Sequence, residues 1–400
     1  MNDYRVPRGV CVMGVKDQKD YDICQRMILG DLNLGQAAKL IGKGRRQVQR
    51  ILARVRKLGM GGVLHGNRGR APVNKTSADL KKVVQDLFKD RYFDFNVTHF
   101  REKLIKEHGV NLSHDTLLRW GHQEHLVKRA HHIRRPKLHR TRSRLPRAGM
   151  LLQMDGSHHR WFGPKLMESC LVGNIDDATS RCCFGEFSPG EDTFSVLTVM
   201  KKTIERHGVP EVLYLDQAGF HGKIHPKAKN INWEKHLTHL ERAMSDLGVR
   251  VLFATSPQAK GRIERMWNTF QDRLIPELRI RNIQKIPTAN LFLQNHFIPE
   301  FNDKFSVPAA EVFKPAWQPI PENYKNKLHE IFCLREWRKV TPGDTISWDG
   351  KTYSVEHDYN YSMRGLQIEL RTYLDQTWAG FHANKPVKLT QIDSLKKLAA

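Results

Sequence analysis

The sequence predicts a multidomain α and α/β chain, with helical modules first, a mixed sheet covered by helices in the middle, and a small β-barrel last. Two sets of amphipathic helical segments, an alternation of strand and helix patterns, and short C-terminal strands between turn residues support this prediction. A chain of 400 residues is too long for one hydrophobic core. We expect five segments, with the bounds 1–66, 67–127, 128–148, 149–325 and 326–400.

The charge balance favours a nucleic-acid partner. The chain has 66 basic and 42 acidic residues, a net charge of +24 with its 20 histidines neutral, which suits a polyanion. No apolar run approaches the ~18 residues that would span a bilayer, and the charged first twenty residues contain no secretory signal. The six cysteines have no CxxC spacing and are expected to be reduced thiols of a cytoplasmic protein without a membrane partner.

Residues 1–66 are expected to form a helix-turn-helix domain. Helical patterns at 20–29, 34–42 and 45–59 are separated by short Gly-containing turns, and the last segment is basic. An ordinary three-helix bundle with a solvated basic face is the alternative. If the segment binds DNA, the contacts are expected from the start of the last helix, at Arg45, Arg46, Gln47 and Arg50.

A second helix-turn-helix domain is predicted at 67–127. Its helical segments follow a Gly/Arg-rich linker, and Ser113 is placed to cap the last of them. On this last helix, His114 and Arg119 are expected to contact DNA. The next twenty residues, 128–147, contain nine Lys or Arg and no acid, which suits an extended connector along a phosphate backbone. Arg134, Arg135 and Arg140 are the contacts expected there, although a solvated linker would have the same composition.

Residues 149–325 alternate between strand and helix patterns in the order βββαβαβα. A hairpin comes first and βα units follow, which is the order of a ribonuclease-H-like domain with a mixed sheet and helices on both faces. The C-terminal segment, 326–400, reads as short strands of a small SH3-like β-barrel. A nucleic-acid or protein contact and a purely structural role are equally compatible with it.

Three acids stand at the ends of elements in the α/β segment. Asp155 closes the first strand, Asp216 closes the strand expected beside it, and Glu264 lies on a helix whose core face includes Ile263 and Trp267. Converging carboxylates are the ligands that Mg²⁺ or Mn²⁺ prefers, and two such ions roughly 3.5–4 Å apart serve phosphodiester chemistry. We expect two ions, with Asp155 bridging them.

Other acids and histidines are competing candidates. Asp176 and Asp177 lie in the predicted hairpin turn and are expected to form it, and Asp192 is expected to cap a helix. Four histidines follow Asp216 without a cysteine among them, so a zinc site is not favoured. These histidines are His221, His225, His236 and His239.

The segments QMDGS, YLDQAG and SPQAKGRIERMWNTFQDRL resemble the DDE motif of insertion-sequence transposases and retroviral-type integrases. Over nearly the whole chain the likeness is greatest to ISNCY-type transposases, and more distant to phage Mu transposase. The resemblance implies that Asp155, Asp216 and Glu264 bind the metal ions, and that Lys260 and Arg262 contact DNA. It also implies nicking of 3′ transposon ends, joining of the 3′-hydroxyl to target DNA, a dimer or larger oligomer on DNA, and a bacterial, nucleoid-associated location.

The sequence departs from the family pattern between Asp216 and Glu264. The 47 intervening residues are more than many relatives have, and we expect the extra segment to grip transposon-end DNA. Two alternative functions remain: a DNA-binding repressor with an inactive ribonuclease-H-like domain, and a nuclease without strand transfer. Acids at all three positions argue against the repressor. Paired helix-turn-helix modules suit the recognition of specific duplex ends, which argues against a structure-selective nuclease.

Overall fold

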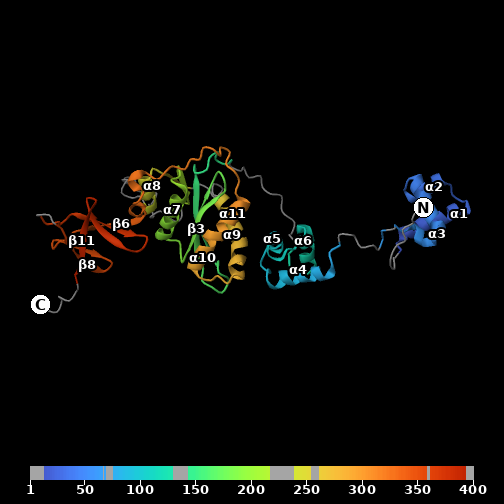
Figure 1. Cartoon of the computed structure of the whole chain (residues 1–400), viewed down its shortest axis with the longest axis horizontal. Helices are drawn as coiled ribbons and strands as arrows, with labels where there is room; N and C mark the ends of the chain where they lie inside the picture. Colours follow the sequence, from blue (N-terminus) through green and yellow to red (C-terminus); the bar gives the residue numbers. More distant parts are fainter. Residues whose placement is uncertain are drawn as a thin grey trace, which may run out of the picture. The chain divides into compact units, whose positions relative to one another are not determined.

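The fold was determined from a computed structural model (Figure 1). The structure describes residues 13–65, 67–68, 75–128, 143–216, 238–253, 261–357 and 361–392. The chain divides into two compact units, Met1–Asp86 and Leu87–Ala400. Within the described ranges, no helix is both long enough and apolar enough to cross a membrane.

The N-terminal unit contains the predicted trio of helices around one small core. Asn33 starts the second helix, because its side chain accepts a hydrogen bond from the Gln36 backbone at 2.9 Å and its own backbone N–H donates to the Gln36 side chain. Buried Val48, Ile51 and Val55 lie on the inner face of the third. The elements are α1 (Val15–Leu29), α2 (Leu34–Ile41), α3 (Arg45–Leu58) and a 3₁₀ turn, η1 (Gly59–Val63).

Gly62 is required where η1 meets α3. A Cβ at this position would lie 2.4 Å from the Val55 backbone nitrogen, whereas one at Gly61 would meet nothing within 4 Å. We expect Gly62→Ala to destabilise the unit by about 1–3 kcal/mol through overpacking, measured as a lower thermal unfolding midpoint. Gly61→Ala is the matched control, and equal shifts in the two variants would contradict the close packing.

The second predicted trio is also present. Ser113 caps the last helix of the trio by accepting from the Thr116 backbone at 3.2 Å, as expected. The rings of Phe88 and Phe100 stack with centroids 4.4 Å apart and join the first helix to the second. These helices are α4 (Ala78–Asp90), α5 (Val97–His108) and α6 (His114–Gln123).

A five-stranded mixed sheet with helices on both faces forms the middle of the chain, as the sequence predicts. The strand order is β3-β2-β1-β4-β5, with β1 antiparallel to β2 and parallel to β4, and β4 parallel to β5. This is the ribonuclease-H-like order, with β1 at its centre. The strands are β1 (Leu152–His159), β2 (Ser169–Asp176), β3 (Cys182–Ser188), β4 (Val212–Leu215) and β5 (Arg250–Phe253).

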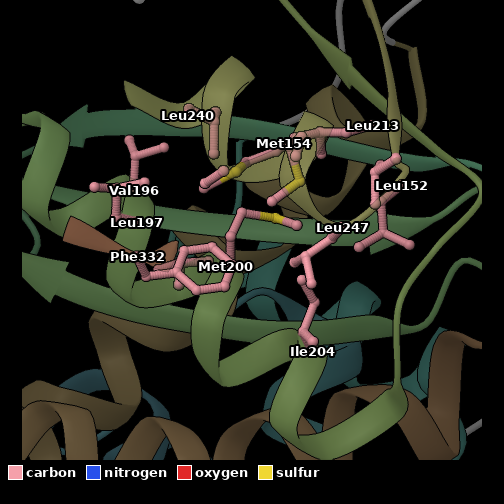
Figure 2. Close-up of a cluster of buried hydrophobic side chains, with 14 of the residues drawn as sticks. Leu152, Met154, Val196, Leu197, Met200, Ile204, Leu213, Leu240, Leu247 and Phe332 are labelled. Carbon is pink, nitrogen blue, oxygen red and sulfur yellow. The ribbon is translucent and has the colours of Figure 1, made fainter. Parts of the chain in front are cut away.

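Each face of this sheet has its own core (Figure 2 shows the first). On one face, Leu152, Met154 and Leu213 pack against α7 (Thr193–His207) and α8 (His239–Asp246). On the other face, Leu171 and Ile175 pack against the helices that follow β5. Those helices are α9 (Gly261–Ile280), α10 (Ile286–Phe292) and α11 (Ile298–Phe305), with a π turn at Leu293–Phe297. The sheet is therefore buried from both sides.

Helices α10 and α11 were not expected from the sequence. Pro287 and Pro299 punctuate this stretch, but each stands in the first turn of its helix. Proline is tolerated there because the first backbone N–H groups of a helix have no partner within it. These helices complete the second core through Ala289, Leu293 and Phe301.

The C-terminal segment is a six-stranded antiparallel sheet in the order β6-β9-β10-β11-β8-β7. It curls into a half-barrel, in which β6 and β7 are the two edge strands of the order rather than a closing pair. The predicted small barrel is thus present in open form. Its strands are β6 (Cys333–Lys339), β7 (Thr345–Trp348), β8 (Lys351–Glu356), β9 (Gln367–Tyr373), β10 (Trp378–His382) and β11 (Lys385–Ile392), preceded by η5 (Glu322–Tyr324) and α12 (Leu328–Ile331).

Helix α5 contacts α9 through buried charges within the larger unit. Glu277 of α9 accepts hydrogen bonds from Lys103 at 2.7 Å and pairs with His99 at 2.8 Å. Next to them, Arg273 of α9 donates to Glu102 at 2.8 Å. Lys103, His99 and Glu277 are all about 4 % exposed, so this is a polar contact closed to solvent.

Candidate active site

One face of β1 is aligned with α9 over three successive contacts. Alternate β1 side chains, two residues apart, meet α9 positions four residues apart. Two strand residues advance ~6.6 Å and four helix residues ~6 Å, so the two elements stay in register. The contacts are Ile263 N to Gln153 Oε1 at 3.3 Å, Trp267 Nε1 to Asp155 Oδ2 at 3.3 Å, and Gln271 Nε2 to Ser157 Oγ at 3.2 Å.

Asp155 is the central member of this row. Its carboxylate is half-buried and oriented by the indole N–H of Trp267. Gly173 is its partner on β2, and a Cβ at Gly173 would lie 3.0 Å from the Trp267 ring. The glycine therefore leaves room for Trp267 to lie against the sheet and reach Asp155.

Asp216 lies level with Asp155. The parallel register pairs Gln153 with Tyr214, so two residues further along each strand Asp155 stands beside Asp216. Adjacent strands are roughly 4.8 Å apart. Leu213 and Leu215 belong to the core on the α7 face. By alternation, Asp216 is directed to the α9 face, where it is exposed at the end of β4.

Glu264 lies in the first turn of α9. It follows Ile263, which is fully buried and bonded to Gln153. One residue along a helix is a rotation of about 100°, and Glu264 is accordingly exposed at the edge of the core. By this register Asp155 and Asp216 are level on neighbouring strands, and Glu264 lies in the turn of α9 that is hydrogen-bonded to β1.

A different trio of side chains is closer together. Among the described residues, His158, Cys170 and Glu191 form the group of three whose ligand atoms all lie within 4.8 Å of one another. His158 and Cys170 are cross-strand partners on the α7 face, opposite Asp155. Burial, followed by the charges of Glu191 and Asp155, raises the pKa of Cys170 to about 12. A thiol that stays protonated is a poor metal ligand, and sulfur and imidazole donors do not suit Mg²⁺, which takes oxygen ligands.

The ligand atoms of Asp155, Asp216 and Glu264 do not all lie within 4.8 Å of one another. Their carboxylate oxygens are the donors that hard divalent ions take. Trp267 holds Asp155 in place. Asp216 is exposed just after the end of β4, and Glu264 is exposed in the first turn of α9. The residues present therefore fit Mg²⁺ or Mn²⁺.

Two of the three competing acids have the expected structural roles. Asp176 accepts hydrogen bonds from the Thr179 backbone at 2.8 Å and from its hydroxyl at 2.6 Å, which closes the hairpin turn. Asp192 caps α7 by accepting from the Ser195 backbone at 2.7 Å. Asp177 differs from the expectation. It is fully buried and receives Arg262 Nε at 2.7 Å.

Arg262, which the resemblance implies as a DNA contact, takes part in this ion pair. The Arg262 side chain is only 9 % exposed and its charge is met by Asp177, so it faces the protein interior. The DNA contact expected of Arg262 came from the resemblance to the DDE motif, in which this arginine stands two residues before Glu264. The sequence contained one sign of the ion pair. A buried Arg needs a carboxylate partner, and Asp176 and Asp177 stand in the hairpin between β2 and β3.

The structure describes some of the other residues that are expected to contact DNA. Arg45, Arg46, Gln47 and Arg50 are exposed on α3, after the Gly42–Gly44 turn from α2. His114 and Arg119 are exposed on α6. Arg134, Arg135, Arg140 and Lys260 lie outside the described residues, as do His221, His225 and His236 and most of the long segment between Asp216 and Glu264.

Comparisons with known proteins identify the family. Residues 24–81 match the winged helix-turn-helix family model. The chain is 30 % identical over 381 residues to a protein of Sinorhizobium fredii named as transposase y4bF, covering 93 % of this chain and 81 % of the relative. This chain belongs to the transposase family. The transposase for insertion sequence IS1202 of Streptococcus pneumoniae is 26 % identical, covering 85 % of this chain and 78 % of that one.

Solved structures of retroviral integrases give low-scoring matches to this transposase. The HTLV-2 integrase catalytic core domain in complex with magnesium has a TM-score of 0.26 and 14 % identity, covering 37 % of this chain and 88 % of that chain. A chain of the simian T-cell lymphotropic virus intasome, in complex with a PP2A regulatory subunit, has a TM-score of 0.30 and 14 % identity, covering 72 % and 92 %. The strand order described above, not these scores, establishes the fold.

Family membership makes the protein a nucleic-acid-processing enzyme. The helix-turn-helix match at 24–81 includes all of α2 and α3 and supports the predicted DNA-binding module, extending beyond the expected limit at residue 66.

Proposed function

We propose that the protein is a DDE transposase whose catalytic residues are Asp155, Asp216 and Glu264. The observation that supports this most is the shared register of β1, β4 and α9. It sets two carboxylates level on neighbouring parallel strands, on the face along which α9 lies in hydrogen-bonded contact. In this proposal the three residues, far apart in the sequence and on three elements, would meet at one site.

In this proposal the carboxylates of Asp155, Asp216 and Glu264 would hold the divalent ions, two of them if the reaction follows the two-metal pattern. Such ions, when bound, stabilise the negative charge that builds up on the attacked phosphate and on the leaving oxygen. Trp267 keeps Asp155 from turning into the sheet. The contact of Ile263 with Gln153 holds the first turn of α9, and therefore Glu264, near the strand ends.

Two successive displacements at phosphorus then account for transposition. Water attacks the phosphodiester at the transposon end, the bond to the 3′ oxygen breaks, and a 3′-hydroxyl and a 5′-phosphate result. That 3′-hydroxyl next attacks a target phosphodiester, forms a new bond, and releases a target 3′-hydroxyl. Both steps need an in-line nucleophile and a stabilised leaving oxygen, so one site serves both.

We infer that α3 reads the transposon ends and that at least two copies of the chain hold two ends together. Arg46 and Arg50 are exposed on α3, four residues apart on one side of the helix. If Arg50 contacts a base, we expect Arg50→Ala to weaken binding to end DNA by about 1–3 kcal/mol. If it contacts a phosphate, we expect the slope of log affinity against log salt concentration to fall by about one.

Fluorescence anisotropy at several salt concentrations measures this effect. Lys19→Ala, an exposed cation on α1, is the control and should bind end DNA nearly as the unaltered protein does. Equal losses in the two variants would show that general charge, and not α3, governs the contact.

One assay separates the proposed function from its alternatives. Purified protein is mixed with Mg²⁺, a labelled duplex of the inverted repeats that bracket its gene, and a supercoiled plasmid. The proposal predicts label joined covalently to the plasmid. Cleavage without joining would indicate a nuclease, and binding without either reaction would indicate a repressor.

A further inference from the structure

The first turn of α9 is fixed to the sheet by a buried group of three residues, Gln153, Asp177 and Arg262, called here the Asp177 clamp. Arg262 Nε and Gln153 Nε2 both donate to Asp177 Oδ1, at 2.7 and 3.1 Å. The other carboxylate oxygen accepts from the Leu145 backbone at 3.1 Å. The hairpin between β2 and β3 is thereby connected to both β1 and α9.

Gln153 also supplies a cap to α9 from outside the helix. The first four backbone N–H groups of a helix have no partner within it. Ile263, the third residue of α9, donates its N–H to Gln153 Oε1 at 3.3 Å. The amide of Gln153 is oriented for this contact because its nitrogen is engaged by Asp177. One side chain of β1 therefore joins the acidic group to the start of the helix.

The clamp residues are closed to solvent. Gln153 and Asp177 are 0 % exposed and the Arg262 side chain 9 %. A single buried charge is costly and a paired one is held by its partner. The ion pair therefore holds the Arg262 side chain against Asp177. Because Arg262 belongs to the first turn of α9, the pair also holds that turn in place.

The spacing connects the clamp to both ends of the proposed active site. Gln153 stands two residues before Asp155 on the same face of β1, and Arg262 stands two residues before Glu264. We propose that Asp177, Gln153 and Arg262 are positioning residues that set the distance between the Asp155 and Glu264 carboxylates. This inference rests on the proposed function, and the clamp residues themselves touch neither substrate nor metal.

The test compares Asp177→Asn with a matched loss of a buried acid elsewhere. Glu369 of β9 is 4 % exposed and accepts two hydrogen bonds from Arg371, each at 3.1 Å. Glu369→Gln therefore also deprives a buried arginine of its counter-charge, but in the C-terminal sheet. Gln153→Met, which removes the cap and leaves the Asp177–Arg262 pair in place, is a milder second variant.

Two measurements on the full chain report the position of Glu264 without relying on catalysis. Hydrogen exchange follows the Ile263 amide and the first turn of α9. Electron paramagnetic resonance of free Mn²⁺ gives the metal dissociation constant. For Asp177→Asn we expect faster exchange confined to that turn and at least a tenfold weaker Mn²⁺ affinity, with smaller changes in the same direction for Gln153→Met. Glu369→Gln should leave both readouts unchanged.

The outcomes separate this inference from the proposed function. Unaltered exchange and Mn²⁺ affinity in Asp177→Asn would overturn the clamp, as would equal losses in Glu369→Gln. If Asp177→Asn does not fold, Gln153→Met decides by the same two readouts. If the unaltered protein binds no Mn²⁺, the proposed metal site fails, and the exchange of the first turn of α9 alone then decides for or against the clamp.

Discussion

Asp155→Asn is expected to reduce both end cleavage and joining by on the order of 1,000-fold, because several kcal/mol of transition-state stabilisation depend on its carboxylate. Asparagine has nearly the same shape and can still accept the hydrogen bond from Trp267. It has lost the negative charge that would be shared by two cations. Folding and end binding should therefore persist while the chemistry stops.

Quantified gel assays of nicked and joined products measure the effect on each step. Asp216→Asn and Glu264→Gln are expected to behave alike, since each removes one anionic ligand from the same site. Asp303→Asn is the control, because this acid is exposed on α11 and removes the same charge from the protein. Full joining activity in any one of the three variants would remove that residue from the proposed site.

Glu277→Gln is expected to destabilise the contact of α5 with α9 by about 3–5 kcal/mol, the usual cost of removing one partner of a buried ion pair. Glu277 is the common partner of Lys103 and His99, and it also pairs with Arg281. Without the carboxylate, Lys103 keeps its pair with Glu107, at 3.2 Å. The ammonium would then lie buried with reduced compensation.

Native-state hydrogen exchange of the α5 amides gives the free energy of this local opening. The control is the double variant Glu277→Leu with Lys103→Met, which replaces the pair with apolar groups. Such replacements are often neutral, so the double variant should recover most of the lost stability. If it is as unstable as Glu277→Gln, the loss comes from packing and not from the unpaired charge.

The same contact is expected to weaken in acid. Burial raises the pKa of Glu277, but hydrogen bonds from His99 and Lys103 outweigh it and lower the pKa from 4.5 to about 2. A group whose folded pKa is depressed contributes stability above its unfolded pKa, so this part is lost as the pH falls from about 4.5 towards 2. Burial lowers the pKa of His99 below 6.5, which adds a loss that begins below that pH.

The elements that the sequence predicted well are those with local signals. Asn33, Ser113 and Asp192 each start a helix by accepting a backbone hydrogen bond, and such caps are visible as residue types. Asp155 and Asp216 were recognisable because each closes a strongly apolar run. Their level placement on neighbouring strands follows from the strand order, which the alternation of elements predicts.

The features that the sequence did not predict depend on partners distant in the chain. Asp177 was assigned to a turn because it follows Asp176, yet its role is set by Arg262, 85 residues later. No role was predicted for Gln153 beyond its place in the first strand. It is nevertheless a polar side chain in a buried strand, and such a side chain needs a hydrogen-bond partner. Helices α10 and α11 were not predicted; Pro287 and Pro299, a residue type that can signal a break, are first-turn residues of these helices.

The central claim is that Asp155, Asp216 and Glu264 hold divalent ions together. Crystals of the full chain with its end DNA, soaked in Mn²⁺ and measured at the manganese absorption edge, test it directly. The account predicts two anomalous peaks roughly 3.5–4 Å apart, one or both next to Asp155 and each within bonding distance of Asp216 or Glu264. Peaks confined to His158, Cys170 and Glu191, or none beside Asp155, would contradict it.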